Sequence, residues 1–138
     1  MSKVAKYLHR RIKYCRILSI IVNLDRRKYM KFYNRISEIC RNHKKVALFV
    51  DMDGTIVEYR VFPENFVTTE TKEVFLNAEP LEVILKNLEK INEIDNLDVY
   101  ILSLARSFII VEEKKQWLKK YAPFIREENY ILLNKENG

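Results

Sequence analysis

The sequence of 138 residues predicts an α/β fold in which helices flank a parallel sheet, preceded by a pair of basic helices. The run at 46–50 is apolar and β-branched on consecutive residues, which is typical of a strand covered on both faces, and further strands are expected at 98–104 and 129–133. Helical patterns separate these runs. A strand–helix–strand–helix–strand order requires crossover connections, which join parallel strands.

The first 45 residues predict two helices. Between residues 3 and 22, apolar side chains recur at helical spacing while four cations fall on the other side, as in an amphipathic helix: Lys3, Lys6, Arg10 and Lys13. A second apolar stripe runs from Tyr29 to Cys40, and Asp25 is placed to cap the N-terminus of that helix. We therefore expect a helical pair before the first core strand.

Two further helices are expected between the core strands. Pro80 suits the first turn of a helix whose apolar face runs from Leu81 to Ile91. Residues 107–121 form the other pattern, and its large apolar side chains, Trp117 among them, are expected to point inward. Each of these helices would connect two strands of the sheet.

Charge divides the chain at Lys45. Residues 1–45 hold 14 Lys and Arg and two acids, a net charge of +12, whereas residues 46–138 carry a net charge of −6. We expect a basic N-terminal helical arm at 1–45 and an α/β core at 46–138. The arm could bind nucleic acid, an anionic membrane surface or an acidic partner, or it could dock on the acidic remainder of the chain.

Cysteine content and hydropathy indicate the compartment. Cys15 and Cys40 are the only cysteines, and no secretory signal pattern is found. The apolar run at 17–24 is too short to span a bilayer. A reducing cytoplasm is therefore the expected location.

The stretch VALFVDMDGT at 46–55 places Asp51 and Asp53 directly after a predicted strand. Ligands of open α/β sheets bind outside the carboxyl ends of the strands. Two neighbouring carboxylates repel each other and attract a cation, and oxygen ligands favour Mg²⁺. We therefore expect Asp51 and Asp53 to bind Mg²⁺ and a phosphorylated ligand.

Phosphate ester hydrolysis needs a nucleophile, a proton for the leaving oxygen and positive charge near the phosphoryl group. Asp51 could attack the phosphorus, and Asp53 could protonate the leaving group and later activate water. Gly54 would permit a tight turn that presents backbone N–H groups to the phosphate. Ser103 ends the second predicted strand and could hold a phosphate oxygen, and Lys135, after the third strand, could add positive charge.

Each of these residues also has a simpler interpretation. Asp-Gly between two apolar runs is a β-hairpin signal, which would leave Asp51 and Asp53 solvated. Ser103 could cap a helix, and Lys135 could be a solvated residue near the end of this sequence. A calcium-binding loop is excluded because the further acidic positions that it requires are missing from Thr55 onward.

The order of these motifs resembles the haloacid dehalogenase (HAD) superfamily of phosphohydrolases. Its first motif, an apolar strand followed by Asp-x-Asp-Gly-Thr, matches FVDMDGT, and its second, an apolar strand ending in Ser or Thr, matches VYILS. The resemblance implies a Rossmann-like sheet and an Mg²⁺ cofactor. It implies that Asp51 is the nucleophile and a metal ligand, and that Asp53 is the general acid and base, with its backbone on the metal.

The resemblance assigns three further roles. Thr55 would stabilise the turn after the first motif, and Ser103 would bind phosphate. The stretch EEKKQWLKKYAPFIREENYILLNK looks like the linker before the third-motif lysine in the 5′-nucleotidase branch of the superfamily, which points to Lys135.

The family's fourth motif, an acidic pair at the end of another strand, is not found after Lys135, and no aspartate follows Asp98. Without that strand, the 46–50 strand would present an unpaired edge. We expect the N-terminal helices or a partner chain to cover this edge; alternatively, the sequence is part of a longer protein that supplies the strand.

The sequence therefore supports two alternative functions. The first is an Mg²⁺-dependent phosphohydrolase, such as a 5′-nucleotidase, that acts on a small phosphate ester through an aspartyl-phosphate. The second is a catalytically impaired HAD-like binding module whose basic arm binds nucleic acid, a membrane surface or an acidic partner.

Overall fold

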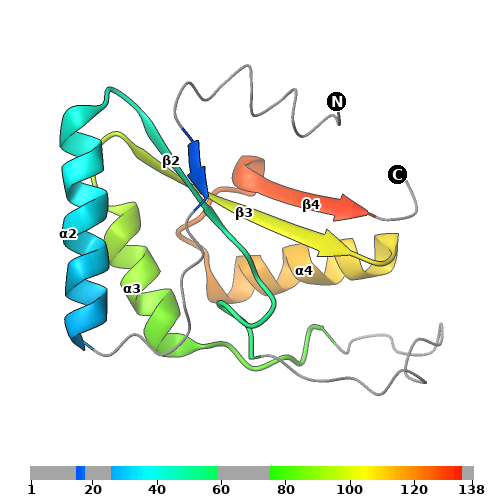
Figure 1. The fold of residues 1–138 in the computed structure, drawn as a ribbon. Helices are drawn as coiled ribbons and strands as arrows, with labels where there is room; N and C mark the ends of the chain where they lie inside the picture. The colour runs from blue at the N-terminus through cyan, green and yellow to red at the C-terminus, as the bar shows by residue number, and fades with distance from the viewer. Residues whose placement is uncertain (1–14, 18–25, 59–74, 135–138) are drawn as a thin grey trace.

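The computed structural model describes residues 15–17, 26–58 and 75–134 (Figure 1). The elements in chain order are β1 (Cys15–Ile17), α2 (Arg26–Asn42), β2 (Val46–Val50), α3 (Glu82–Asn92), β3 (Leu97–Ala105), α4 (Phe108–Tyr121), the 3₁₀ helix η2 (Glu127–Asn129) and β4 (Tyr130–Asn134).

The strands form one parallel sheet in the order β1-β2-β3-β4. Val50 pairs with Ile101, so β3 continues beyond the end of β2 and carries Ser103 further along the sheet. The predicted α/β fold with a parallel sheet and flanking helices is confirmed. The three expected core strands correspond to β2, β3 and β4, each within one residue of its predicted ends.

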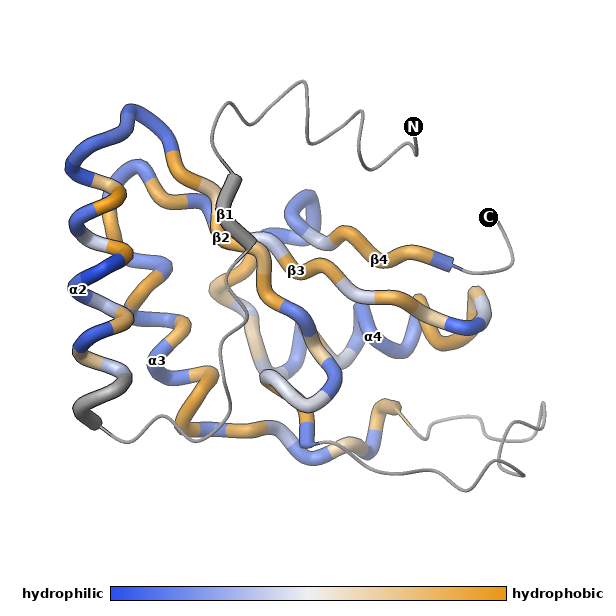
Figure 2. Tube along the Cα trace, viewed as in Figure 1, coloured by the Kyte–Doolittle hydropathy of each residue, from blue (hydrophilic) through white to orange (hydrophobic). Residues whose placement is uncertain are grey.

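All described helices pack on one face of the sheet, which we call the first face (Figure 1). Each crossover from β1 to β4 steps to the next strand in the same direction. Right-handed crossovers that step in one direction place their helices on one face. Figure 2 shows apolar residues along the strands and polar residues along much of the helices. The core residues of the first face come from β2 and β3 (Val46, Leu48, Val50, Leu97, Val99, Ile101) and from the helices (Ile36, Cys40, Ile84, Leu85, Leu88, Ile91, Trp117, Leu118).

The helices between the core strands lie close to their predicted positions. Ser107 caps α4, because its Oγ accepts a hydrogen bond from the Ile110 N–H at 3.4 Å. Trp117 is 1% exposed, which confirms the prediction that its side chain points inward. Pro80 was expected in the first turn of α3 but lies before its N-cap, Leu81, where it forms a bridge with Val57.

The N-terminal prediction is wrong at Cys15–Ile17, which form β1 rather than part of a helix over 3–22. The rest of that segment lies outside the described residues, as does Asp25, while the second expected helix is α2. The account of an open strand edge is also wrong. β1 pairs with β2 from Cys15↔Ala47 to Ile17↔Phe49, so β2 has a strand of this chain on both sides. Pairing satisfies backbone groups that an edge would expose.

Asn96 joins α2 to the turn before β3. Its backbone has a φ of 58°, and its Nδ2 donates to the carbonyl oxygens of Cys40 at 2.7 Å and His43 at 2.6 Å. These carbonyls lie at the C-terminal end of α2, where the helix leaves its acceptors unsatisfied. Asn96 therefore fixes the end of α2 beside the start of β2.

Candidate active site

The first motif lies at the carboxyl end of β2, where the polypeptide leaves the sheet. Asp51 directly follows the last strand residue and has an exposed side chain, and its Oδ1 accepts a hydrogen bond from the Met52 N–H at 2.8 Å. Because β2 is parallel to both of its neighbours, Asp51 does not lie in a two-stranded ribbon. The hairpin interpretation of Asp-Gly is therefore wrong.

The turn after Asp51 is held by hydrogen bonds among its own backbone groups. The Met52 carbonyl accepts hydrogen bonds from the N–H groups of Thr55, Ile56 and Val57 at 3.0 to 3.1 Å. The Gly54 N–H donates to the Val57 carbonyl oxygen at 2.9 Å. Gly54 has a φ of 74°, which a residue without a Cβ adopts at little cost. The expectation that Gly54 opens the N–H groups of this turn to a phosphate is therefore wrong for residues 54–57.

Lys114 on α4 reaches the turn from the next crossover. Its Nζ donates to Ser103 Oγ at 2.8 Å, to the Leu104 carbonyl at 2.9 Å and to Asp53 Oδ2 at 3.2 Å. The lysine side chain is 2% exposed, whereas that of Asp53 is 48% exposed. An ammonium has three N–H donors, and these three acceptors use all of them. Lys114 therefore fixes Asp53 and Ser103 relative to each other.

Ser103 lies two residues before the end of β3. It is 3% exposed and belongs to the part of β3 that extends past β2. Because Ser103 Oγ accepts from Lys114, its own hydroxyl hydrogen can donate only to a different acceptor.

One aromatic ring lies against the lysine. Its Nζ lies 5.1 Å from the ring centroid of Phe75, a geometry in which a cation and a π face attract each other. Phe75 packs edge to face on Trp117 at 6.3 Å, and Trp117 Nε1 donates to the Ala78 carbonyl at 3.0 Å. The segment before α3 is thereby held against α4 beside the ammonium.

The structure thus joins Asp53 and Ser103 through Lys114 and places Asp51 two residues before Asp53. Thr55 is 8% exposed and lies in the same turn, as a turn-stabilising role requires. Lys135 lies outside the described residues. Lys114 is the residue that sequence reasoning missed.

A signal for Lys114 was present in the sequence. It falls three residues after Val111 and four before Leu118, both buried, so it shares the apolar stripe of α4. A lysine on such a stripe needs buried acceptors.

The acidic residues near the turn allow a simple test of whether magnesium fits. Among the residues that the structure describes, no group of three or more His, Cys, Asp or Glu side chains is placed to hold a metal. Mg²⁺ is commonly held by one or two carboxylates together with substrate phosphate and water. The exposed carboxylate of Asp51 fits such a site, while one oxygen of Asp53 is committed to Lys114.

Comparison with protein-family models, with curated proteins and with solved structures found no match to this chain. Within 15–17, 26–58 and 75–134, no helix has both the length and the apolar content needed to cross a membrane.

Proposed function

We propose that this chain is an Mg²⁺-dependent phosphohydrolase of the HAD type that hydrolyses a small phosphate ester through an aspartyl-phosphate. The observation that carries the proposal is the contact of Lys114 with both Asp53 and Ser103. This contact unites residues of the first and second motifs at the carboxyl ends of parallel strands, where α/β sheets bind ligands. A 5′-nucleotidase activity and a cytoplasmic location remain narrower predictions.

In the first step, a carboxylate oxygen of Asp51 attacks phosphorus while the bond from phosphorus to the ester oxygen breaks. Asp53 gives its proton to that leaving oxygen. Only Oδ2 of Asp53 binds Lys114, so Oδ1 is available for proton transfer. The Ser103 hydroxyl donates to a phosphoryl oxygen and orients the group for attack.

In the second step, Asp53 takes a proton from water, and the resulting oxygen attacks the phosphorus of the aspartyl-phosphate. The bond from phosphorus to the Asp51 oxygen breaks, which releases inorganic phosphate, restores the Asp51 carboxylate and leaves Asp53 with the proton for the next turnover. Lys114 remains bound to Asp53 and Ser103 through both steps and acts as a positioning residue.

Asp51 and the substrate phosphate would hold Mg²⁺, with the backbone of Asp53 as the further ligand implied by the family resemblance. When bound, the ion would neutralise charge on the phosphoryl oxygens. Asp51 must also reach phosphorus, which its exposed position permits.

Release of phosphate from an aryl phosphate tests this proposal. The full chain is expected to release phosphate in Mg²⁺ and not in excess chelator. Asp51→Asn should abolish this release because the amide is a poor nucleophile. Asp95→Asn is the matched control, since Asp95 is an exposed acid in the turn before β3. Activity that survives Asp51→Asn would reject the mechanism.

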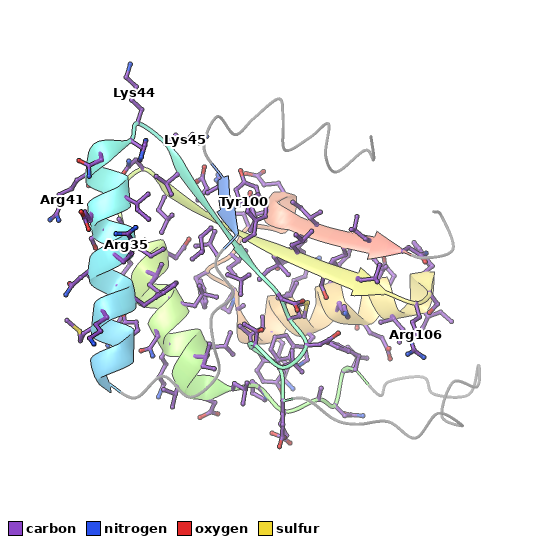
Figure 3. The ribbon with its side chains drawn as sticks, viewed as in Figure 1. Arg35, Arg41, Lys44, Lys45, Tyr100 and Arg106 are labelled. Atoms are coloured by element: carbon purple, nitrogen blue, oxygen red, sulfur yellow. The ribbon has the colours of Figure 1, made fainter. Side chains whose placement is uncertain are left out.

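The binding-module alternative is favoured by exposed positive charge at the amino ends of the strands. Arg41, Lys44 and Lys45 are exposed near the start of β2 (Figure 3). Asp51 follows the other end of this strand. Lys45 is paired with Asp98 at 3.3 Å. A polyanion bound at the amino ends of the strands would not contact the turn at Asp51. Heparin binding that Lys44→Glu weakens, without any phosphatase activity of the chain, would favour this second function.

A further inference from the structure

The side of α2 that faces away from the sheet is strongly basic. Its inner side carries buried core residues such as Ile36 and Cys40. On the opposite side, Lys31, Arg35 and Arg41 are exposed and fall within about a third of the helix circumference. Exposed cations continue into the turn after the helix, where Lys44 projects beyond the end of α2 (Figure 3). We call this set the α2 basic surface; its members are Lys31, Arg35, Arg41, Lys44 and Lys45.

Two of these cations are engaged in ion pairs that water can reach. Arg35 lies 4.0 Å from Glu38, the only acid of α2, and both side chains are more than half exposed. Lys45 lies 3.3 Å from Asp98, and the lysine side chain is 72% exposed. Exposed pairs of this kind contribute little free energy, so another anion can replace the carboxylate.

The other three cations carry charge that no described acid neutralises. Within residues 15–17, 26–58 and 75–134, no ion pair joins Lys31, Arg41 or Lys44 to a carboxylate. The exposed charges of α3, by contrast, cancel one another: Glu82, Lys86, Glu89 and Lys90. Unlike α3, α2 therefore presents net positive charge to an anionic partner.

The α2 basic surface lacks the apolar side chains that a membrane or a protein partner would use. The aromatic residues Tyr29, Phe32 and Tyr33 of α2 pack against the core. Met30, which is 46% exposed, is the one large apolar side chain of α2 that is exposed among its described residues. Interfacial helices insert an apolar face into lipid, and protein interfaces depend on buried apolar or aromatic anchors. A phosphate backbone requires neither, because it is bound through charge.

We propose that the α2 basic surface binds the phosphate backbone of double-stranded DNA without sequence preference. Lys31 and Arg41 lie ten residues apart on α2, which is about 15 Å along the helix. A DNA duplex carries roughly nine phosphates over that length, so each cation can contact one. Guanidinium groups such as those of Arg35 and Arg41 also bind phosphate oxygens in pairs.

The shape and composition of this surface favour duplex DNA over other nucleic acids. The major groove of B-form DNA admits an α-helix, whereas the major groove of duplex RNA is deep and narrow. Binding of a single strand relies on exposed aromatic rings that stack on the bases, and the described aromatic rings of α2 pack against the core. DNA is thus the partner for the second function proposed above, on which this inference rests, and hydrolysis at Asp51 takes no part in it.

Fluorescence anisotropy of the full chain with a labelled DNA duplex of about 20 base pairs tests the proposal. Affinity should fall about 100-fold between about 50 and 200 mM salt, as expected for about four phosphate contacts. A duplex of scrambled sequence should bind equally, and duplex RNA and single-stranded DNA more weakly. Heparin binding without duplex DNA binding would leave the second function standing but overturn DNA as its partner. Preferential binding to duplex RNA, or binding only to phosphatidylserine vesicles, would overturn the proposal too.

Three substitutions with opposite expectations locate the binding surface. Arg41→Gln removes one phosphate contact, so affinity at about 50 mM salt should fall about fivefold and the salt slope should decrease by about 0.9. Glu38→Gln removes a charge that repels phosphate, so it should tighten binding about twofold. Lys86→Gln makes the same charge change on α3 as Arg41→Gln makes on α2, and it should leave the affinity unchanged. Equal losses in Arg41→Gln and Lys86→Gln, or weaker binding of Glu38→Gln, would contradict the assignment to α2.

Asp51→Asn separates this proposal from the proposed hydrolysis. The variant should lose phosphate release and bind the DNA duplex as tightly as the wild-type chain does. A wild-type chain that binds DNA but releases no phosphate would refute hydrolysis alone. Loss of DNA binding in Asp51→Asn would contradict binding through α2.

Discussion

Lys114 Nζ lies 2.8 Å from Ser103 Oγ, and both side chains are nearly excluded from water. A buried ammonium is costly unless acceptors surround it, and here a hydroxyl, a carbonyl and a carboxylate supply them. The bond connects the helix after β3 with the end of that strand. It therefore fixes the geometry on which the proposed chemistry depends.

Replacing Lys114 with Met should impair catalysis more than stability. Met keeps much of the side-chain length but leaves Ser103 without its donor and Asp53 without its ion-pair partner. We expect phosphate release to fall about 100-fold, by analogy with the loss of one preorganised polar group. The free energy of unfolding should fall by about 1–3 kcal/mol because acceptors lose their partner.

Lys115→Met is the matched control for this change. Lys115 neighbours Lys114 on α4, but its side chain is 34% exposed and pairs with Glu112. Turnover and urea unfolding should be close to wild type in this variant. A turnover number that falls equally in both variants would contradict the positioning role of Lys114.

Substitutions at Ser103 and Ser107 should differ in their effect on KM. Ser103→Ala removes the hydroxyl proposed to bind a phosphoryl oxygen, so KM should rise about tenfold, the equivalent of one hydrogen bond. Ser107→Ala removes the cap of α4, so the free energy of unfolding should fall by about 1 kcal/mol with KM unchanged. Steady-state kinetics and urea unfolding of both variants check the pair. An unchanged KM in Ser103→Ala would count against phosphate binding by this serine.

Asn96 should stabilise the fold in two ways that substitutions can separate. Asn96→Gly retains the permitted positive φ but loses both hydrogen bonds to the end of α2. Asn96→Ala loses the bonds and must also adopt that φ with a Cβ, at a further cost of about 1 kcal/mol. Chemical denaturation should therefore rank wild type above Gly and Gly above Ala. Equal stability of the two variants would show that backbone conformation contributes nothing here.

Stability should fall in alkaline solution. Burial raises the pKa of the Cys40 thiol above its usual value of 9.0, and burial followed by the charge of Glu127 raises the pKa of Tyr130. The folded chain therefore keeps protons that the unfolded chain loses, so the free energy of unfolding declines once pH exceeds the usual thiol value. Urea unfolding at about pH 8 and about pH 10 measures this decline. Cys40→Ala should reduce it, and a decline of the same size in that variant would exclude Cys40 as a cause.

Much of the fold was predictable because its local patterns agree with its tertiary packing. The run at 46–50 is buried on both faces of the sheet, as its continuous apolar character indicates, whereas the run at 98–104 is buried in part and exposes Leu104. The helix expected over 107–121 is observed at Phe108–Tyr121, with Trp117 buried as its pattern indicates. Asp51, Asp53 and Ser103 lie at strand ends because the motifs that predict them include the strands themselves.

The remainder depends on contacts between distant segments. β1 has only three residues within an amphipathic pattern, and the pairing with β2 that makes it a strand is invisible to local periodicity. Lys114 lies on the apolar stripe of α4, but its position on the helix does not by itself identify its acceptors. Its role became clear only once the sheet placed Asp53 and Ser103 beside α4.

The location of the phosphoryl group during turnover tests the central claim most directly. The full chain would be mixed with Mg²⁺ and an aryl phosphate, quenched in acid and digested for peptide mass spectrometry. A phosphoryl group on Asp51 that requires Mg²⁺ and disappears in Asp51→Asn is the predicted result. Phosphate release without a covalent phosphoryl group, or with the group on another residue, would contradict Asp51 as the nucleophile.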